Sequence, residues 1–472
     1  MKMKIIHLTL VYTTLFIIYS CNNLKDSSQN AGEAVPPPSP NIIFIMADDL
    51  GFGDLGVYGQ KIIQTPNLDQ MAKEGLRFTN CYAGSPVCAP SRSVLMTGFH
   101  TGHTTVRGNN GKGGVVGLGG KPGRIPLKAS DITIASMLQK NGYTTGIIGK
   151  WGLGEPNTTG EPNDHGFDEW FGYLNQRRAH HYYPEFLWHN KEKYPIPENE
   201  GGAYEVYSHD LFMEKTYEFV KTNKDNPFFL YLPLTIPHDL YEIPSKVPYD
   251  DKPWTEDEKT HAAMITRMDS DLGKLFALLK ELKIEENTVI FFCSDNGAAR
   301  RWEGRFDSSG DLRGRKRDVY EGGIRTPMIV KWPNKISPNS LDSVNSWYFA
   351  DVFPTLLEIA GIDQKNDRDG ISVLPTLLGE NQKELKERPL YWEFLEQEGK
   401  QALRKGDWKV VRLDVHKKGF HTDLELYNVR EDPAEERNLA QKNPEKVAEL
   451  MTIMDEQHIL SGFFPFEFET VQ

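Results

Sequence analysis

Short apolar runs alternate with longer, partly polar segments over most of the chain. A short apolar run between turn-forming residues is typical of a buried strand, and apolar residues at helical spacing predict an amphipathic helix. Asp131 is expected to cap the first predicted helix and Gly142 to end it. This alternation predicts an α/β fold in which a large, mostly parallel or mixed sheet is sandwiched by helices. The runs that predict strands are residues 42–46, 143–148, 228–232, 289–293 and 328–330, and the predicted helices are residues 131–141, 208–221, 256–282 and 350–360.

The pattern changes near residue 388 and indicates a second, smaller structural unit. Closely spaced apolar runs there predict antiparallel strands, and the last amphipathic segment predicts a closing helix. We therefore expect a main domain over residues 41–385 and a small α+β subdomain over residues 386–472. The predicted strands are residues 390–394, 408–413 and 424–427, and the predicted helix is residues 444–457.

Composition narrows the class of protein. The chain has 472 residues, of which 39% are hydrophobic and 25% charged, as expected of a globular protein with a large core. Its formal net charge is −12, and loss of Lys2 and Lys4 with a leader segment would leave −14. This acidity argues against nucleic acid as a partner, and it predicts that any anionic substrate is met by a local basic pocket.

The first forty residues have the features of an export segment. A charged head, an apolar stretch over residues 5–19 and Ser20 before Cys21 predict a signal peptide over residues 1–20. Residues 21–40 are poor in large apolar groups and rich in proline, which predicts a flexible tether. The segment resembles a bacterial lipoprotein signal, in which Cys21 would be acylated. A plain secretory signal is the alternative.

Polar residues lie shortly after four of the predicted strands. In parallel sheets ligands bind beyond the carboxyl ends of the strands, so these side chains are candidates for one site. Carboxylate and amide oxygens suit a hard divalent cation, and calcium tolerates irregular clusters better than magnesium does. Alternatively, the acidic pair could be a cap or turn, and Asn296 with Gly297 a hairpin turn. The residues after the strands are Asp48, Asp49, Lys150, His238, Asp295 and Asn296.

Residues 88–98 carry the most specific motif in the chain. Cys88-Ala-Pro-Ser-Arg92, followed by Thr97-Gly98, resembles the sequence that is modified in formylglycine-dependent sulfatases. The chain is thereby similar, from about residue 41 to its end, to this arylsulfatase-like family of the alkaline phosphatase superfamily, and most of all to secreted bacterial carbohydrate sulfatases. Further matching blocks are residues 41–49, 149–151, 237–238 and 294–297, together with Lys316 before residues 320–323.

The resemblance implies a modified nucleophile and a metal ion. A maturing enzyme would oxidise Cys88 to formylglycine, whose hydrate attacks sulfur, and Arg92 would hold that hydrate. Without the family, Cys88 could be a buried, inert thiol, and Arg92 a surface ion-pair partner. The calcium ligands implied by the resemblance are Asp48, Asp49, Cys88, Asp295 and Asn296.

Two lysines and a histidine complete the implied machinery. Lys150 and Lys316 would bind sulfate oxygens, and His238 would protonate the departing alcohol. Taken alone, each lysine could be a solvated stem and His238 a packed side chain. The choice of Lys316 is complicated by the neighbouring arginines at positions 313, 315 and 317.

The chain departs from the family pattern at one position. The commonest family sequence is Gly-Lys-Trp-His, whereas this chain has Gly152 in place of the histidine that contacts the formylglycine hydroxyl. We hypothesise that His103 substitutes from another loop, or that a water molecule does.

The organic part of the substrate is suggested by residues 175–184, which are rich in aromatic and hydrogen-bonding side chains. This segment resembles one in polysaccharide sulfatases, and Arg177, His180 and His181 are its candidate substrate contacts. A structural loop is the alternative. The glycine-rich residues 108–123 are a further loop that could border the site.

The resulting prediction is a sulfatase acting on sulfated carbohydrates, such as galactose or N-acetylgalactosamine sulfates. We expect it to be exported and lipid-anchored through Cys21 in the periplasm or at the outer membrane of a Gram-negative bacterium. Two alternatives are a phosphatase or phosphodiesterase of the same superfamily and a catalytically dead, glycan-binding relative. The first normally uses a serine or threonine nucleophile with two zinc ions, and the second is suggested by Gly152.

Overall fold

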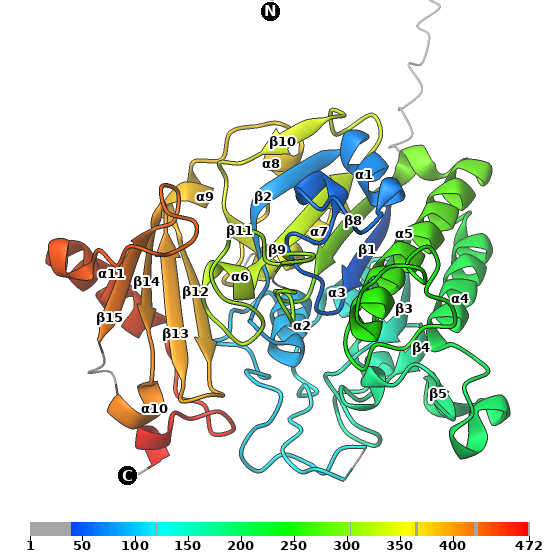
Figure 1. Ribbon diagram of the computed structural model, residues 1–472, viewed down its shortest axis with the longest axis horizontal. Helices are drawn as coiled ribbons and strands as arrows, with labels where there is room; N and C mark the ends of the chain where they lie inside the picture. Colours follow the sequence, from blue (N-terminus) through cyan, green and yellow to red (C-terminus); the bar gives the residue numbers. More distant parts are fainter. Residues whose placement is uncertain (1–38, 119, 303, 364–366, 420–422, 471–472) are drawn as a thin grey trace, which may run out of the picture. The chain divides into compact units, whose positions relative to one another are not determined.

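A large mixed β-sheet forms the centre of the protein (Figure 1). The computed structural model describes residues 39–118, 120–302, 304–363, 367–419 and 423–470. The strand order in this sheet is β10-β2-β9-β8-β1-β7-β3-β4-β5-β6, and β11 pairs with β2. The strands are β1 (Asn41–Ala47), β2 (Leu76–Tyr82), β3 (Thr144–Lys150), β4 (Glu169–Tyr173), β5 (Phe186–His189), β6 (Glu192–Pro195), β7 (Phe228–Pro233), β8 (Thr288–Ser294), β9 (Arg325–Lys331), β10 (Ser340–Asp342) and β11 (Trp347–Tyr348).

Helices cover both faces of this sheet, which confirms the predicted fold class (Figure 1). The longest, α4 (Ser208–Asn223) and α5 (Glu256–Glu281), lie with α1 (Pro66–Lys73) on one face. Helices α2 (Cys88–Thr97), α3 (Ile134–Lys140) and α7 (Val352–Ile359) lie on the other. The short helices are α6 (Glu321–Ile324), α8 (Leu374–Leu377), α9 (Glu384–Glu387) and α10 (Val415–Lys418).

The central strand β1 shows why its sequence is apolar without interruption. It pairs in parallel with β7 on one edge and with β8 on the other. Successive side chains point to opposite faces, so Phe44 joins the core beneath α2, whereas Ile43 and Ile45 join the core beneath α5. Both faces are buried, so residues 42–47 are all apolar and the next polar residue is Asp48.

One predicted helix boundary was wrong. Helix α3 begins at Ile134, and its cap is Thr133, whose hydroxyl accepts a hydrogen bond from the Ser136 backbone N–H at 3.1 Å. Asp131 instead accepts hydrogen bonds from the Lys128 backbone N–H at 2.8 Å and from the Thr105 hydroxyl at 3.0 Å. Both residues are good capping types, and the reciprocal bond, which the Thr133 backbone N–H donates to the Ser136 hydroxyl, favours Thr133. Gly142 follows the helix with a φ of 86°, as predicted for its end.

A separate antiparallel sheet and one helix form the C-terminal part of the described chain (Figure 1). Its strands are β12 (Pro389–Phe394), β13 (Lys400–Lys405), β14 (Trp408–Arg412) and β15 (Leu424–Asn428), in that order. Helix α11 (Pro444–Gln457) packs on this sheet through Leu450 and Met454. The sequence pattern did not predict β13, because lysine, glutamine and arginine occupy much of that strand.

The C-terminal sheet contacts three segments that lead to the candidate site. The Trp392 indole donates to the carbonyl of Ala83, before α2, at 2.9 Å. Glu396 accepts from the backbone N–H of Asn109 in the glycine-rich loop at 3.3 Å. Lys400 donates to the carbonyl of Arg317 at 2.8 Å. These contacts help to hold in place the loops that carry Cys88 and Lys316.

The predicted signal peptide, Cys21 and nearly all of the predicted tether lie outside the described residues. Within the described ranges, none of the helices combines the length and the hydrophobicity that a membrane crossing requires.

Candidate active site

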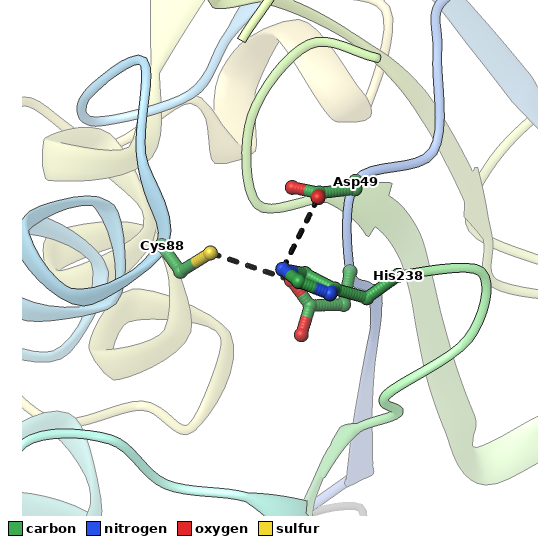
Figure 2. Close-up of side chains that lie close together, drawn as sticks. Asp49, Cys88 and His238 are labelled. Carbon is green, nitrogen blue, oxygen red and sulfur yellow. Dashed lines mark hydrogen bonds and ion pairs between the residues drawn. The ribbon is translucent and has the colours of Figure 1, made fainter. Parts of the chain in front are cut away.

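Side chains from separate segments meet beyond the carboxyl ends of the central strands. Possible ligand atoms of Asp48, Asp49, Cys88 and His238 all lie within 4.8 Å of one another. Figure 2 shows Asp49, Cys88 and His238 pointing toward one another from the turn after β1, from the start of α2 and from the loop after β7. The structure thus brings together groups that are up to 190 residues apart in sequence.

Cys88 is the first residue of α2 and is buried. Its Sγ lies 3.4 Å from Asp48 Oδ1. One turn later, Arg92 is fully buried and donates to Asp295 Oδ2 from Nε at 3.1 Å and from Nη2 at 2.8 Å. Its Nη1 also donates to the carbonyl of Lys150 at 2.6 Å. Arg92 therefore joins the start of α2 to the ends of β8 and β3.

The two adjacent aspartates each pair with a lysine. Asp48 Oδ2 accepts from Lys150 Nζ at 2.5 Å, and both side chains are completely buried. Asp49 Oδ2 accepts from Lys316 Nζ at 2.7 Å. Asp49 has a φ of 66°, in the left-handed region, where its backbone N–H reaches Asp295 Oδ1 at 3.1 Å.

His238 contacts both members of the ion pair between Asp49 and Lys316. Its Nε2 is 3.3 Å from Asp49 Oδ2 and 3.2 Å from Lys316 Nζ. Its Nδ1 faces Asp239 Oδ1 at 2.8 Å, and this hydrogen bond lowers the pKa of Asp239 to about 2. An ionised Asp239 orients the ring and leaves Nε2 facing the cluster.

Burial and mutual charge shift the titration of this cluster. Burial alone would raise the pKa of Asp48, but Lys150, His238 and Arg92 together lower it well below its ordinary value. Burial, followed by the nearby Asp48 carboxylate, raises the pKa of Asp295. Burial and Asp295 also raise the pKa of the Cys88 thiol. An unmodified Cys88 is therefore a poor nucleophile, because the thiolate is disfavoured.

The donor atoms fit a hard divalent cation. Asp48, Asp49, Asp295 and Asn296 offer oxygen atoms, and all four side chains are buried. Asn296 Nδ2 donates to Asp49 Oδ1 at 2.7 Å, which fixes the orientation of the amide. Asn296 Oδ1 has no hydrogen-bond partner within the described part of the chain, although it is fully buried. A buried oxygen without a hydrogen-bond donor, beside three carboxylates, fits the role of a cation ligand.

The structure brings one of the three candidate substrate contacts to this cluster. The ring of His180 stacks on that of His238, with centroids 3.8 Å apart. Burial, together with the charges of His238 and Lys150, lowers the pKa of His180 to about 2, so this ring is neutral near pH 7. Arg177 is exposed, and His181 pairs with Glu242 at 3.1 Å. Neither has a contact with the cluster among those described.

His103 lies in a different group of side chains. Its Nδ1 is 2.9 Å from Asp369 Oδ1, and its ring stacks on His100 with centroids 4.1 Å apart. The hypothesis that His103 stands in for the histidine missing at Gly152 therefore gains no support from these contacts. The space next to Gly152 is occupied instead by Gln176, a residue that the sequence analysis did not single out.

Comparison with known proteins agrees with this geometry. The family model described as Sulfatase matches residues 40–362, and one described as N-sulphoglucosamine sulphohydrolase, C-terminal, matches residues 314–459. The human protein N-acetylgalactosamine-6-sulfatase is 34% identical over 385 residues, covering 76% of this chain and 69% of that relative. N-acetylgalactosamine-6-O-sulfatase of Bacteroides thetaiotaomicron is 28% identical over 527 residues, covering 93% and 96% of the two chains.

A solved structure extends the similarity to the whole fold. The crystal structure of "Ps i-CgsB in complex with k-i-k-neocarrahexaose" superimposes with a TM-score of 0.78 at 28% identity, covering 92% of this chain and 96% of the other. The first family model spans well over half of the chain, and the second extends through the C-terminal sheet. This chain therefore belongs to the sulfatase family and is a sulfatase, a hydrolase of sulfuric esters.

Proposed function

We propose that this sulfatase removes sulfate from carbohydrates, and that galactose or N-acetylgalactosamine sulfates are its substrates. The observation that carries the proposal is the convergence of an acidic, oxygen-rich cluster with Arg92, Lys150 and Lys316 around Cys88. Such a cluster combines possible cation ligands with fixed positive charges, which suits an anionic ester. Two relatives are named for N-acetylgalactosamine 6-sulfate, and a similar structure holds a neocarrahexaose, which supports a sugar as the organic part.

Calcium is the proposed metal, and formylglycine the proposed form of residue 88. Asp48, Asp49, Asp295 and Asn296 would hold the ion, with residue 88 completing the shell; magnesium fits such an irregular cluster less well. When bound, the ion would polarise the sulfate ester and offset its charge. Modification of Cys88 would replace a thiol with a raised pKa by an aldehyde hydrate that supplies a hydroxyl nucleophile.

The remaining residues have roles that follow from their positions. Arg92 would hold the hydrate of residue 88 and tie it to Asp295. Lys150 and Lys316 would present their ammonium groups to the sulfate oxygens, because hydrogen bonds to Asp48 and Asp49 already hold both groups within the cluster. His238 would donate the proton of Nε2 to the departing sugar oxygen, while Asp239 holds Nδ1. His180, stacked on His238, would contact the sugar.

The test is a screen of defined substrates with protein coexpressed with a sulfatase-maturing enzyme. We expect release of sulfate from galactose or N-acetylgalactosamine sulfates, dependence on calcium, and a mass change at residue 88. Cys88→Ala should abolish turnover. Faster turnover of phosphate esters with zinc would favour the phosphatase alternative. An unmodified Cys88 in the natural host, together with sugar binding, would favour the glycan-binding alternative.

We also propose that the protein is exported and held to a membrane by acylated Cys21, because residues 1–21 resemble a lipoprotein signal. The test is expression of the full chain in a Gram-negative host with and without Cys21→Ser. The unaltered protein should fractionate with membranes and carry lipid on its N-terminal residue, and the variant should be released. Equal membrane association of both proteins would contradict the anchor.

A further inference from the structure

Gly152 and Gln176 form a matched pair beside the candidate active site. Gly152 follows Lys150 by two residues and has a φ of 80°. A Cβ at position 152 would lie 2.6 Å from Gln176 Cδ, and closer still to its Nε2. The amide of Gln176 therefore occupies the volume that a side chain at position 152 would need. The two segments are held together by the Gly152 backbone N–H, which donates to the carbonyl of Leu174 at 3.1 Å.

The Gln176 amide is buried and unpartnered. Its side chain belongs to a residue that is 5% exposed, and Nε2 has no hydrogen-bond partner among the described residues. Buried amide groups are nearly always hydrogen-bonded, so an unmet donor calls for an explanation. An N–H₂ group only donates, and its missing partner must therefore be an acceptor such as an oxygen atom.

The surroundings of this amide point toward the nucleophile. Gln176 and Gly152 line a small cavity together with Ala89, Arg124, Asn109 and Glu155. Ala89 directly follows Cys88 at the start of α2. Both carboxylate oxygens of Glu155 already accept hydrogen bonds, one from the Asn175 amide and one from the Leu118 backbone N–H. Arg124 Nη1 already donates to the carbonyl of Asn109. Gln176 Nε2 is thus a buried donor on this side that has no partner within the described part of the chain.

We infer that Gln176 Nε2 donates a hydrogen bond to an oxygen of the sulfuryl group bound between residue 88 and Lys150. This inference rests on the proposed function, which it deepens by adding a catalytic residue that contacts the ester. Gln176 fills the place that a side chain at position 152 would take, and Gly152 is required because it leaves that place open. An amide exchanges no proton near neutral pH, so Gln176 binds and orients the group without acting as a base.

The test compares Gln176→Ala with Gln64→Ala, which removes an exposed glutamine whose described contacts are with Tyr249 and Thr266. With matured residue 88, Gln176→Ala should lower kcat/KM about 10²- to 10³-fold, the loss typical of one donor to a developing charge. It should weaken the binding of inorganic sulfate, measured by calorimetry, by a comparable factor. The ratio of kcat/KM for the variant to kcat/KM for the unaltered enzyme should be constant from pH 6 to 8. Gln64→Ala should change none of these quantities.

Thermal unfolding distinguishes this role from a structural one. Removing an unpaired buried donor should leave Tm unchanged or raise it, whereas a glutamine that stabilises the fold would lower Tm on removal. Gly152→Ala should also reduce sulfate binding, because its Cβ displaces the amide, and the loss should be less than additive with Gln176→Ala.

Three results would overturn the inference. The first is a kcat/KM for Gln176→Ala equal to that of Gln64→Ala. The second is an affinity of Gln176→Ala for inorganic sulfate equal to that of the unaltered enzyme. The third is a lower Tm of Gln176→Ala together with unchanged activity. If the unaltered enzyme, with matured residue 88, hydrolyses no sulfate ester, the proposed function fails as well. The two failures are therefore separable.

Discussion

Each buried acid of the candidate site has a lysine or an arginine as its nearest basic partner. Lys150 pairs with Asp48, Lys316 with Asp49 and Arg92 with Asp295. Removing one member of such a pair leaves a buried, uncompensated charge, at a cost of about 3–5 kcal/mol. Substitutions of the six charged residues would therefore reduce stability as well as activity. Asn296 and His238 are better probes, because their changes leave these pairs intact.

The calcium proposal predicts that Asn296→Ala removes most of the stabilisation that calcium provides. With free calcium at about 100 times its Kd, the unaltered protein should gain about 2.7 kcal/mol in unfolding free energy. The variant lacks the unpartnered Oδ1 and should gain much less at the same concentration. Chemical denaturation with calcium and with chelator measures both gains. Asn226→Ala, at an exposed turn, is the control; an equal gain in both variants would remove Asn296 from the metal site.

The proton-donor role of His238 predicts a dependence on the leaving group. A sugar alkoxide needs a proton to depart, whereas a nitrophenolate does not. His238→Gln should therefore lower kcat/KM about 10²- to 10⁴-fold on sugar sulfates and much less on nitrophenyl sulfate. His189→Gln, at an exposed position, is the matched control. Equal losses on both substrates would show that His238 acts by binding rather than by proton transfer.

At the level of single residues, the sequence predicted the members of the site but not their partners. Asp48, Asp295 and Lys150 were found because each follows an apolar strand. Gln176 was missed, since nothing in its sequence neighbourhood marks a buried amide. The one available signal was the absence of a side chain at Gly152, and only the three-dimensional packing shows which residue fills that space.

At the scale of elements, the buried strands at the sheet centre were predicted well, whereas β2, β4 and β13 were missed. The central strands β1, β7 and β8 are buried on both faces, and residues 42–46, 228–232 and 289–293 within them are continuous apolar runs. Strand β3 is also buried, although threonines and glycines interrupt its apolar residues. Strand β2 alternates buried and partly exposed residues, including Arg77 and Asn80, and escaped the pattern. Helix boundaries depended on details of capping, as the shift from Asp131 to Thr133 shows.

Helix caps at buried and exposed ends should differ in their contribution to stability. Thr255 caps α5 at an exposed end, and Thr255→Ala should cost about 1 kcal/mol. Thr133 is fully buried and also donates to the carbonyl of His165 at 2.6 Å. Thr133→Ala should therefore cost more, about 2 kcal/mol. Urea denaturation of both variants measures the two losses in unfolding free energy. Equal losses would mean that the hydrogen bond from Thr133 to His165 contributes nothing.

At the scale of the whole molecule, the C-terminal sheet is joined to the loop after α2 by buried hydrogen bonds. Glu393 on β12 accepts from Arg107 at 3.1 Å and from His458 at 2.7 Å. Its backbone N–H donates to the hydroxyl of Thr101 at 2.8 Å. The strand thereby binds the loop after α2 to the end of α11. The C-terminal residues are thus structural partners of the segment that carries Cys88.

This network predicts a pH-dependent contribution to stability. Burial alone would lower the pKa of His458, but hydrogen bonds to Glu393 and Glu469 raise it. Burial would raise the pKa of Glu393, but His458 and Arg107 lower it. The His458 contribution is complete below its unfolded pKa of about 6.5 and is lost as pH rises through the folded value. The Glu393 contribution is complete above about 4.3 and is lost as pH falls through its folded value.

His458→Gln should therefore destabilise the protein most between about pH 4.3 and 6.5. The expected loss there is about 1–3 kcal/mol, as for a hydrogen bond to a charged group, and it should shrink toward pH 9. Unfolding midpoints in urea at several pH values measure the difference. A loss that is independent of pH, or that grows at high pH, would contradict the charged pairing.

The sequence by itself determined the fold class, the parallel strands at the sheet centre and most members of the site, because uninterrupted apolar runs must be buried and the polar residue after each must lie at one edge. The resemblance around Cys88 then indicated the chemistry. Only the tertiary structure decided which acid pairs with which base, that Asn296 Oδ1 is left without a donor, that His103 lies in another cluster, and that Gln176 fills the space over Gly152. These are contacts between residues far apart in the chain or on different loops, and no local pattern encodes them.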